Sequence, residues 1–294
     1  MKLSVLDFSK IDPRSNDPIE ALHASIALAR DCDAWGYHRF WLAEHHAADV
    51  AHSCPEILMS VVAGVTERIR IGVAGVLLSY YSPLRIAKAF RLLNVLFPNR
   101  IDLGLARATV DPAIASSLAS HAVADNHNTY AAKVSAVLEF LHDKGRAPAN
   151  PVGVSVPEIW LLGTRLGSVS IAAESGTAFC LSLFADDLVT QKGVVLANYR
   201  DGFQPSPELA APRAAIAVAG VCAPSVRQAN EAVQSWQSNL RPSVVGTARQ
   251  CRDKLEQLAQ MYGVDEIVFL DVTPDSKARR RTYRLLADVF QLAT

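Results

Sequence analysis

The chain lacks the features that mark secreted, membrane-spanning or zinc-binding proteins. Only five of its 294 residues are cysteine, and these are widely separated, with no Cys-x-x-Cys pair. An odd number of dispersed cysteines indicates reduced thiols rather than a disulfide framework or a metal site. No apolar run approaches the roughly 18 residues that a membrane span requires. We therefore expect a cytoplasmic protein with no membrane partner.

An excess of charge of one sign is also absent. The 29 Lys and Arg residues equal the 29 Asp and Glu residues, so the formal net charge is zero. Nucleic-acid binding requires a concentrated positive surface, so this balance argues against it. The one basic run, Arg279-Arg280-Arg281, is interpreted as the solvent-exposed face of a late helix. The first seven residues indicate a strand rather than a signal peptide, because they turn acidic without a long apolar segment.

What the chain does contain is a regular alternation of short apolar runs with longer amphipathic ones, and half of its residues are hydrophobic. The predicted strands are residues 3–8, 40–44, 69–78, 101–106, 159–163, 178–184, 215–222 and 266–271. Helices are predicted at 18–34, 55–66, 83–97, 129–144 and 169–175, and residues 53–56 have the spacing of a capping box.

Eight such units in a chain of this length predict an α/β protein, a single-domain TIM (β/α)8 barrel spanning residues 1–294. A doubly wound open sheet is the main alternative, but no Gly-x-Gly-x-x-Gly motif follows an early strand. The proline-rich stretches 145–157 and 204–212 are predicted loops, and neither separates two plausible cores.

Functional residues of such a barrel lie at the carboxyl ends of its strands. The second strand ends in Glu44-His45-His46, three titratable groups at the expected rim. Successive strand side chains point to opposite faces, so Glu44 and His46 are predicted on one side and His45 on the other. This alternation argues against a paired metal site, and we expect no metal. Titratable groups at a rim favour a catalytic role for Glu44 and His45.

Small and basic residues at the next strand ends favour an anionic, flat ligand. Ala74 and Gly75 in the third strand permit close approach of a ligand to the backbone, although a bulge at a barrel corner explains them equally well. Arg107 follows the fourth strand, where a guanidinium can hold a phosphate in two hydrogen bonds.

A second group of candidates follows the fifth strand, at the start of the next helix. Gly163, Thr164, Arg165 and Ser168 combine flexible backbone, hydroxyls and a cation at a helix N-terminus, which is a common anion site. Ordinary helix capping is the alternative explanation. Because the fourth and fifth strands are neighbours, we expect Arg107 and this turn to share one phosphate. Motifs of serine hydrolases and zinc proteases are absent.

Beyond these patterns, the sequence resembles the bacterial luciferase-like flavin monooxygenases over nearly its whole length. The stretches that carry the resemblance are RFWLAEHH at 39–46, SCPE at 53–56, IRIGVAGVLL at 69–78, YSPL at 81–84, PNRIDLG at 98–104, IWLLGT at 159–164, YRDGFQPS at 199–206, VGT at 245–247 and YGVDEI at 262–267.

The resemblance implies a TIM barrel that uses reduced FMN, supplied by a separate flavin reductase, and O2 to oxygenate a small organic substrate, with specialised metabolism as one setting. By position, His45 resembles the acid/base residue near the flavin, and Ala74-Gly75 resembles a non-prolyl cis peptide under the flavin ring. Arg107, Thr164, Arg165 and Ser168 resemble the phosphate-binding set, with the protein orienting the flavin and the cofactor supplying the redox chemistry.

Two alternatives remain at this point, an F420-dependent oxidoreductase and a non-catalytic flavin-binding barrel or partner subunit. The sequence also departs from the family in a segment that is shortened around residues 236–244, so that the barrel mouth is more open or is closed by a partner. The resemblance implies a homodimer formed through the second and third helices, whose apolar residues serve both core and interface: Leu58, Val61, Val62, Val65, Leu92, Leu93 and Leu96.

Overall fold

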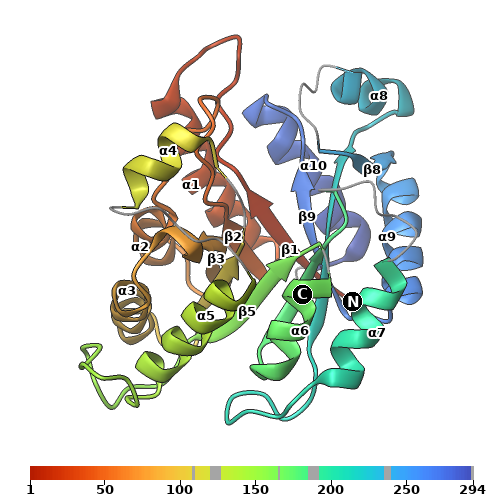
Figure 1. Ribbon diagram of the computed structural model, residues 1–294. Coiled ribbons are helices and arrows are strands. Elements are labelled where there is room, and N and C mark those ends of the chain that lie inside the picture. The colour runs from red at the N-terminus through yellow and green to blue at the C-terminus, as the bar shows by residue number, and fades with distance from the viewer. Residues whose placement is uncertain (108–109, 120–126, 165, 185–191, 235–239, 293–294) are drawn as a thin grey trace.

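The computed structural model describes residues 1–107, 110–119, 127–164, 166–184, 192–234 and 240–292. Parallel strands form a central barrel and helices surround it (Figure 1). The strands are β1 (Lys2–Asp7), β2 (Arg39–Leu42), β3 (Arg70–Leu77), β4 (Ile101–Ala106), β5 (Glu158–Gly163), β6 (Ala178–Ser182), β7 (Ala214–Cys222), β8 (Pro242–Gly246) and β9 (Glu266–Asp271). The helices are α1 (Pro18–Ala34), α2 (Pro55–Gly64), η1 (Leu78–Tyr80), α3 (Pro83–Leu96), α4 (Pro112–Leu118), α5 (His127–Leu141), α6 (Leu166–Glu174), α7 (Lys192–Gly202), α8 (Val226–Gln234), α9 (Ala248–Tyr262) and α10 (Ser276–Phe290).

The predicted TIM barrel is confirmed. Strands β1 to β7 follow one another around the ring, and β9 closes it by pairing with both β7 and β1, every pair being parallel. The eight predicted strands are the eight of this ring. A further strand, β8, was missed because it is short, half-exposed and paired only with the carboxyl-terminal part of β7.

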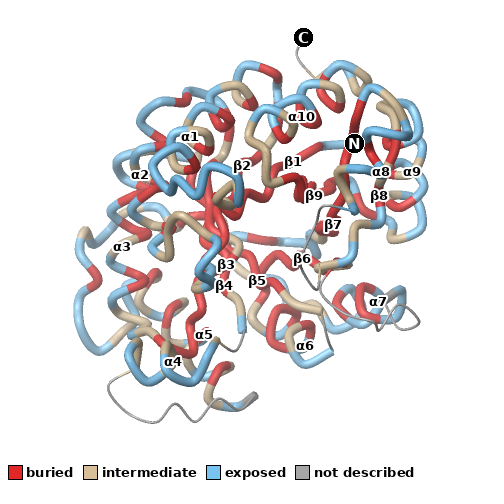
Figure 2. The backbone as a smooth tube through the Cα atoms, turned by 90° about the horizontal axis from the view of Figure 1, so that it is seen from above, coloured by how far each residue is buried: buried red, intermediate tan, exposed pale blue. Residues whose placement is uncertain are grey.

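Two apolar cores, one on each side of the strands, hold the barrel together. The outer core lies between strands and helices, while the inner core fills the barrel itself. Figure 2 shows the result from above, with buried residues along the strands and on the inward faces of the helices. This arrangement follows from strand alternation, because residues one apart face opposite sides of the barrel wall.

Two local expectations were wrong. Helix α2 does begin at Pro55, but its N-cap is Cys54, which makes no side-chain capping bond, so the expected capping box is not formed. Ser53 lies one position too early to cap. The second error concerns the basic run of α10: Arg280 and Arg281 are exposed as expected, but Arg279 is buried and lies 3.4 Å from the Asp7 carboxylate.

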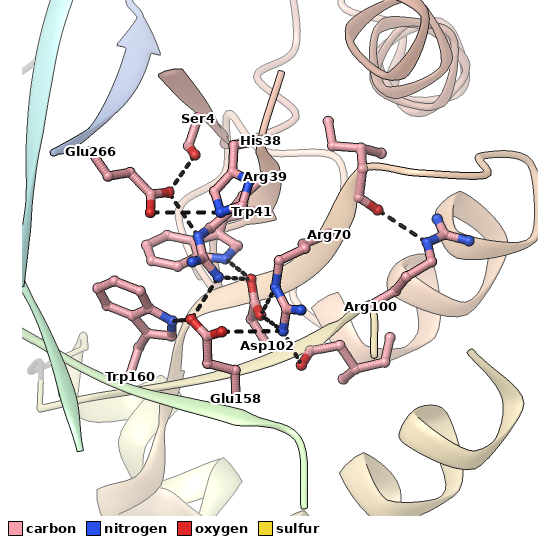
Figure 3. A network of polar contacts seen from close by, with 12 residues as sticks. Ser4, His38, Arg39, Trp41, Arg70, Arg100, Asp102, Glu158, Trp160 and Glu266 are labelled. Atoms are coloured by element: carbon pink, nitrogen blue, oxygen red, sulfur yellow. Dashed lines mark hydrogen bonds and ion pairs between the residues drawn. The ribbon is translucent and has the colours of Figure 1, made fainter. Parts of the chain in front are cut away.

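Charged side chains close the barrel at the amino ends of its strands (Figure 3). Arg39 is buried there, and its Nη1 donates to Asp102 Oδ2 at 2.9 Å. The same Nη1 lies 2.8 Å from Glu158 Oε1, and Nε donates to Glu266 Oε1 at 2.7 Å. Burying an arginine is tolerable only when carboxylates compensate its charge and satisfy its donors, and here three do so.

Two indoles cover this charged floor from inside the barrel. The guanidinium of Arg39 lies 4.8 Å from the ring centroid of Trp160, and Trp160 meets Trp41 edge to face at 5.3 Å. The Trp41 indole donates to Asp102 at 2.9 Å. Gly72 makes room for it, because a Cβ there would lie 2.6 Å from the Trp41 ring. Large rings therefore fill the barrel near the amino ends of its strands, and smaller residues lie near the carboxyl ends.

Candidate functional site

Small residues end the strands on one side of the barrel mouth. Within the carboxyl halves of β3, β4, β5 and β6, the partly exposed residues are Ala74, Ala106, Gly163 and Ser182, while the other residues there are buried. We call these four residues the small-residue shelf. A surface of this kind offers a flat ligand close contact with the strand ends, without large side chains in the way.

The backbone under the shelf is locally irregular. The peptide bond between Ala74 and Gly75 is cis, as the resemblance implies, and the register between β3 and β4 shifts between Val73 and Val76. Strand β4 approaches this irregularity closely at Gly104, where a Cβ would lie 2.0 Å from the Val73 carbonyl oxygen. The glycine is thus required by close backbone packing.

The predicted phosphate residues lie beside the middle of the shelf, after β4 and β5. Ala106 pairs with Leu162, so Arg107 and Gly163 leave neighbouring strands at the same level. Arg107 is exposed, and Thr164 and Ser168 are half-buried around the start of α6. The turn is tight, since a Cβ on Gly163 would lie 2.5 Å from that of Ser168. The predicted Arg165 lies outside the described residues.

Glu44 contacts three segments beside the β3 end of the shelf. Its Oε2 accepts a hydrogen bond from the Leu77 backbone N–H at 2.9 Å. Its Oε1 accepts from the Tyr81 hydroxyl at 2.5 Å and lies 2.9 Å from His46 Nε2. Only 2% of the Glu44 side chain is exposed. Glu44 and His46 therefore share one side, as strand alternation predicted, and the carboxylate is enclosed by its partners.

The segment after β3 is also held from outside the barrel. The Lys133 ammonium on α5 donates to the carbonyl oxygens of Leu78, Ser79 and Tyr81, at distances of 3.2, 2.5 and 3.1 Å. Neither Lys133 nor Tyr81 was identified from the sequence as part of the site. The Tyr81-Ser82-Pro83-Leu84 stretch of the resemblance pointed to Tyr81, whereas nothing local to α5 pointed to Lys133.

His45 lies on the other side of the strand end. Its ring stacks on Phe8, with centroids 5.1 Å apart, and the residue is exposed. The pKa of His45 is lowered, because the surrounding protein desolvates the ring and Lys10 then repels its positive charge. Lys10 forms an ion pair with Asp49, which joins the loops after β1 and β2. A neutral imidazole is thus favoured at this position.

Other features of the molecule lie away from the mouth. A cavity of about 480 Å³ opens at the amino ends of the strands and is lined by Arg70, Glu158, His142 and Arg213 among others. Because it is at the opposite end of the barrel from the shelf, it is not part of this site. Among the described residues no three acidic, histidine or cysteine side chains gather as metal ligands. Within the same residues, no helix is both long and apolar enough to cross a membrane.

Known proteins are similar to this chain over most or nearly all of its length. The family model described as luciferase-like monooxygenase matches residues 1–244. The Bacillus subtilis protein YwcH is 33% identical, covering 99% of each chain, and an Escherichia coli protein named luciferase-like monooxygenase is 34% identical over 95% of this chain and 85% of its own. The crystal structure of apo-MsnO8 is 30% identical, covers 99% of this chain and 98% of its own, and has a TM-score of 0.88.

More distant structures share the fold alone. The oxygenating constituent of a diketocamphane monooxygenase from Pseudomonas putida, in complex with FMN, has a TM-score of 0.74 at 14% identity, covering 100% of this chain and 98% of its own. An F420-dependent secondary alcohol dehydrogenase has a TM-score of 0.74 at 13% identity, covering 100% and 99%. The fold by itself therefore does not distinguish FMN from F420.

Proposed function

Because the chain belongs to the luciferase-like monooxygenase family and is a flavin-dependent monooxygenase, we propose that it uses reduced FMN, supplied by a separate flavin reductase, and O2 to oxygenate a small organic substrate. The observation that carries this proposal is the small-residue shelf, whose two middle strands end beside Arg107 and the start of α6. A ligand with both a flat ring and a phosphate group would fit the shelf and the region of Arg107 and α6, respectively.

In this proposal each part of the site has one task. Ala74 and Gly75 support the flavin ring from below. Arg107, Thr164 and Ser168 hold the phosphate, together with Arg165 and the first amides of α6, where the helix dipole favours an anion. Gly163 allows α6 to approach closely enough for this.

When bound, the flavin supplies the electrons that activate O2. The residues of the chain would bind and orient it, exclude water through the apolar inner core, and handle a proton at the Glu44-His45-His46 run. Glu44 and His45 are the catalytic candidates carried over from the sequence.

The proposal is tested by comparing ligands that differ in one group. We expect the protein to bind reduced FMN with O2 consumption on oxidation, and to bind F420 more weakly. Arg107→Gln is expected to weaken FMN binding by roughly 10-fold, the loss of one charge-assisted contact, and to leave riboflavin binding unchanged, because riboflavin has no phosphate. Titration followed by flavin fluorescence measures all three ligands.

Preferred binding of F420, or equal loss of FMN and riboflavin in Arg107→Gln, would contradict the proposal. Arg280→Gln is the matched control, since Arg280 is an exposed residue of α10 and pairs with Asp31 away from the shelf.

We further propose a homodimer built on α2 and α3, which lie side by side in Figure 1. Leu58, Val62 and Leu93 are buried in the core. The large apolar side chains that these helices expose, together with the C-cap residue of α2, form what we call the α2/α3 face, six side chains at 44–64% exposure: Ile57, Val61, Val65, Leu92, Val95 and Leu96. Exposed apolar side chains gathered on two neighbouring helices favour an interface. We also propose that residues 1–294 form one domain, with the family segment shortened around 236–244.

A further inference from the structure

We infer that the cavity at the amino ends of the strands is a second binding site, for a small uncharged organic molecule that has an apolar body and carries an N–H or O–H donor. The inference goes beyond the proposed flavin function, because this cavity lies at the opposite end of the barrel from the shelf. It is carried by the composition of the cavity wall and by one buried amide oxygen of that wall that has no partner.

The cavity has the size and the kind of wall that small-molecule sites have. Its volume of about 480 Å³ lies within the range of about 300–1,000 Å³ that is usual for such sites. It is formed where α3, α5 and the loop 206–209 meet the first residues of β4, β5 and β6. Much of the wall is apolar: Ile101, Leu138, Val156, Pro157, Ile159, Ala178 and Leu209. The apolar body of a small molecule can therefore be buried there.

The charged side chains of the wall are balanced. Two arginines and two glutamates line the cavity: Arg70, Arg213, Glu158 and Glu208. Glu158 Oε2 lies 2.9 Å from Arg213 Nη1 and 3.6 Å from Arg70 Nη2. Glu208 Oε2 lies 3.3 Å from His142 Nε2, so each glutamate has a basic side chain of the same wall beside it. A charged ligand would have to compete with one of these pairs, whereas an uncharged ligand would not.

Asn94 supplies the polar group that selects for a donor. It lies near the end of α3, lines the cavity and is only 3% exposed. Its Nδ2 donates to the carbonyl oxygen and to the hydroxyl of Ser155, at 2.9 and 3.0 Å, which fixes the orientation of the side-chain amide. The amide oxygen Oδ1 accepts no hydrogen bond from the described residues and is not sealed off by protein. Oδ1 therefore faces the cavity as an open acceptor, which only a donor can satisfy.

Arg213 offers donors to the same cavity. Its guanidinium uses Nη1 for Glu158, while Nε and Nη2 have no partner among the described residues. The backbone of Arg213 is held in place, because its N–H donates to the Tyr199 hydroxyl at 3.2 Å and its carbonyl oxygen accepts from the Phe179 N–H at 3.0 Å. A ligand with an acceptor as well as a donor can thus meet polar groups of both kinds. A primary aromatic amide has this combination and no charge.

A first experiment compares three small probes that differ at one group. Benzamide is uncharged and has N–H donors, N,N-dimethylbenzamide lacks the donors, and benzoate has a negative charge in place of the amide. We expect benzamide to bind the full chain with a dissociation constant of about 1 mM, an ordinary value for so small a molecule. The other two probes are expected to bind at least about 10-fold more weakly, because Asn94 Oδ1 then has no donor. Titration followed by NMR of the ¹⁵N-labelled protein measures all three.

Two variants locate the binding in this cavity. Asn94→Leu removes the acceptor, so the preference for benzamide over N,N-dimethylbenzamide is expected to fall from at least about 10-fold to less than about 2-fold. Ser175→Phe is expected to abolish benzamide binding by filling the cavity, since Ser175 lines it and its hydroxyl makes no hydrogen bond with the described residues. Gln228→Leu is the matched control, because it removes an amide from a separate cavity of about 200 Å³ beside β7 and α8, and it is expected to change nothing.

Equal affinities for benzamide and its dimethyl derivative, binding of benzoate as tight as that of benzamide, or no binding of benzamide at tens of millimolar would overturn the inference. So would benzamide binding that Asn94→Leu and Ser175→Phe both leave unchanged, because the molecule would then lie elsewhere. If Asn94→Leu does not fold, the three probes and Ser175→Phe still decide. None of these outcomes depends on FMN binding, so the proposed function stands or falls separately.

Discussion

Single glycines decide how closely β3 and β4 approach under the proposed flavin ring. A Cβ on Gly104 would meet the backbone oxygen of Val73 at 2.0 Å, and backbone cannot rotate away as a side chain can. We expect Gly104→Ala to lower the free energy of unfolding by at least about 2 kcal/mol through overpacking. Urea unfolding of the isolated protein measures this.

Gly64→Ala is the matched control for that change. Gly64 ends α2, and a Cβ added there would have nothing within 4 Å, so alanine is expected to be neutral or to stabilise by up to about 1 kcal/mol. If both variants unfold at the same urea concentration, close packing at Gly104 does not explain the glycine.

The site residues could be predicted from the sequence in part. Glu44 and His45 follow the end of β2, and Ala74 and Gly75 lie in the carboxyl half of β3, so strand position alone placed them toward the mouth. Lys133 could not be found this way, because its role depends on where α5 crosses η1. Which partner a charged side chain meets across the fold is a tertiary property that local sequence does not contain.

At the scale of elements, the sequence predicted the positions of strands and helices well, but it did not predict which side chains meet across the fold. Strands β4 and β9 have the predicted ends, and the helix over residues 18–34 agrees throughout, because apolar periodicity and capping residues are local signals. Strand β8 has no strong alternation and was missed. Arg279 was expected in solvent because its own helix is polar, and only the fold brings it to Asp7.

The charged residues at the amino ends of β2, β4 and β5 make the free energy of unfolding depend on pH. Although burial acts in the opposite direction, Arg39, Arg70 and Arg213 lower the pKa of Glu158 from its ordinary 4.5 to about 2. A carboxyl whose pKa is lowered in the folded state stabilises it above the ordinary value and loses that contribution as pH falls toward the lowered one. Burial raises the pKa of Asp102, which opposes this effect.

We therefore expect the free energy of unfolding to decline as pH falls from 4.5 toward 2, and to decline less steeply in Glu158→Gln. The variant is also expected to be less stable than the wild-type protein at pH 7, because Arg39 and Arg213 lose a partner. Thermal unfolding measured from pH 7 down to pH 2 gives both quantities. Parallel pH profiles for the two proteins would show that Glu158 does not contribute.

At the scale of the whole molecule, the α2/α3 face leads to a prediction about assembly. A charge placed at Val61 or Leu92 would have to be buried in the proposed interface, so Val61→Glu and Leu92→Glu are expected to convert a dimer into a folded monomer. Light scattering after size-exclusion chromatography measures the mass. Met261→Glu, at a more exposed apolar residue on α9, is expected to leave the dimer intact; a monomeric wild-type protein would contradict the proposal.

In the described part of the chain, the barrel is closed at the amino ends of its strands by three side chains: Arg39, Trp41 and Trp160. Ligands that bind inside the barrel would therefore enter and leave at the carboxyl ends of its strands, and the deepest ligand would enter first and leave last. Under the proposed function, a flavin on the small-residue shelf would enter before the organic substrate, and the product would leave before the flavin is exchanged. The bound substrate or product would thus block flavin exchange, so the rate of flavin exchange would depend on the rate of product release.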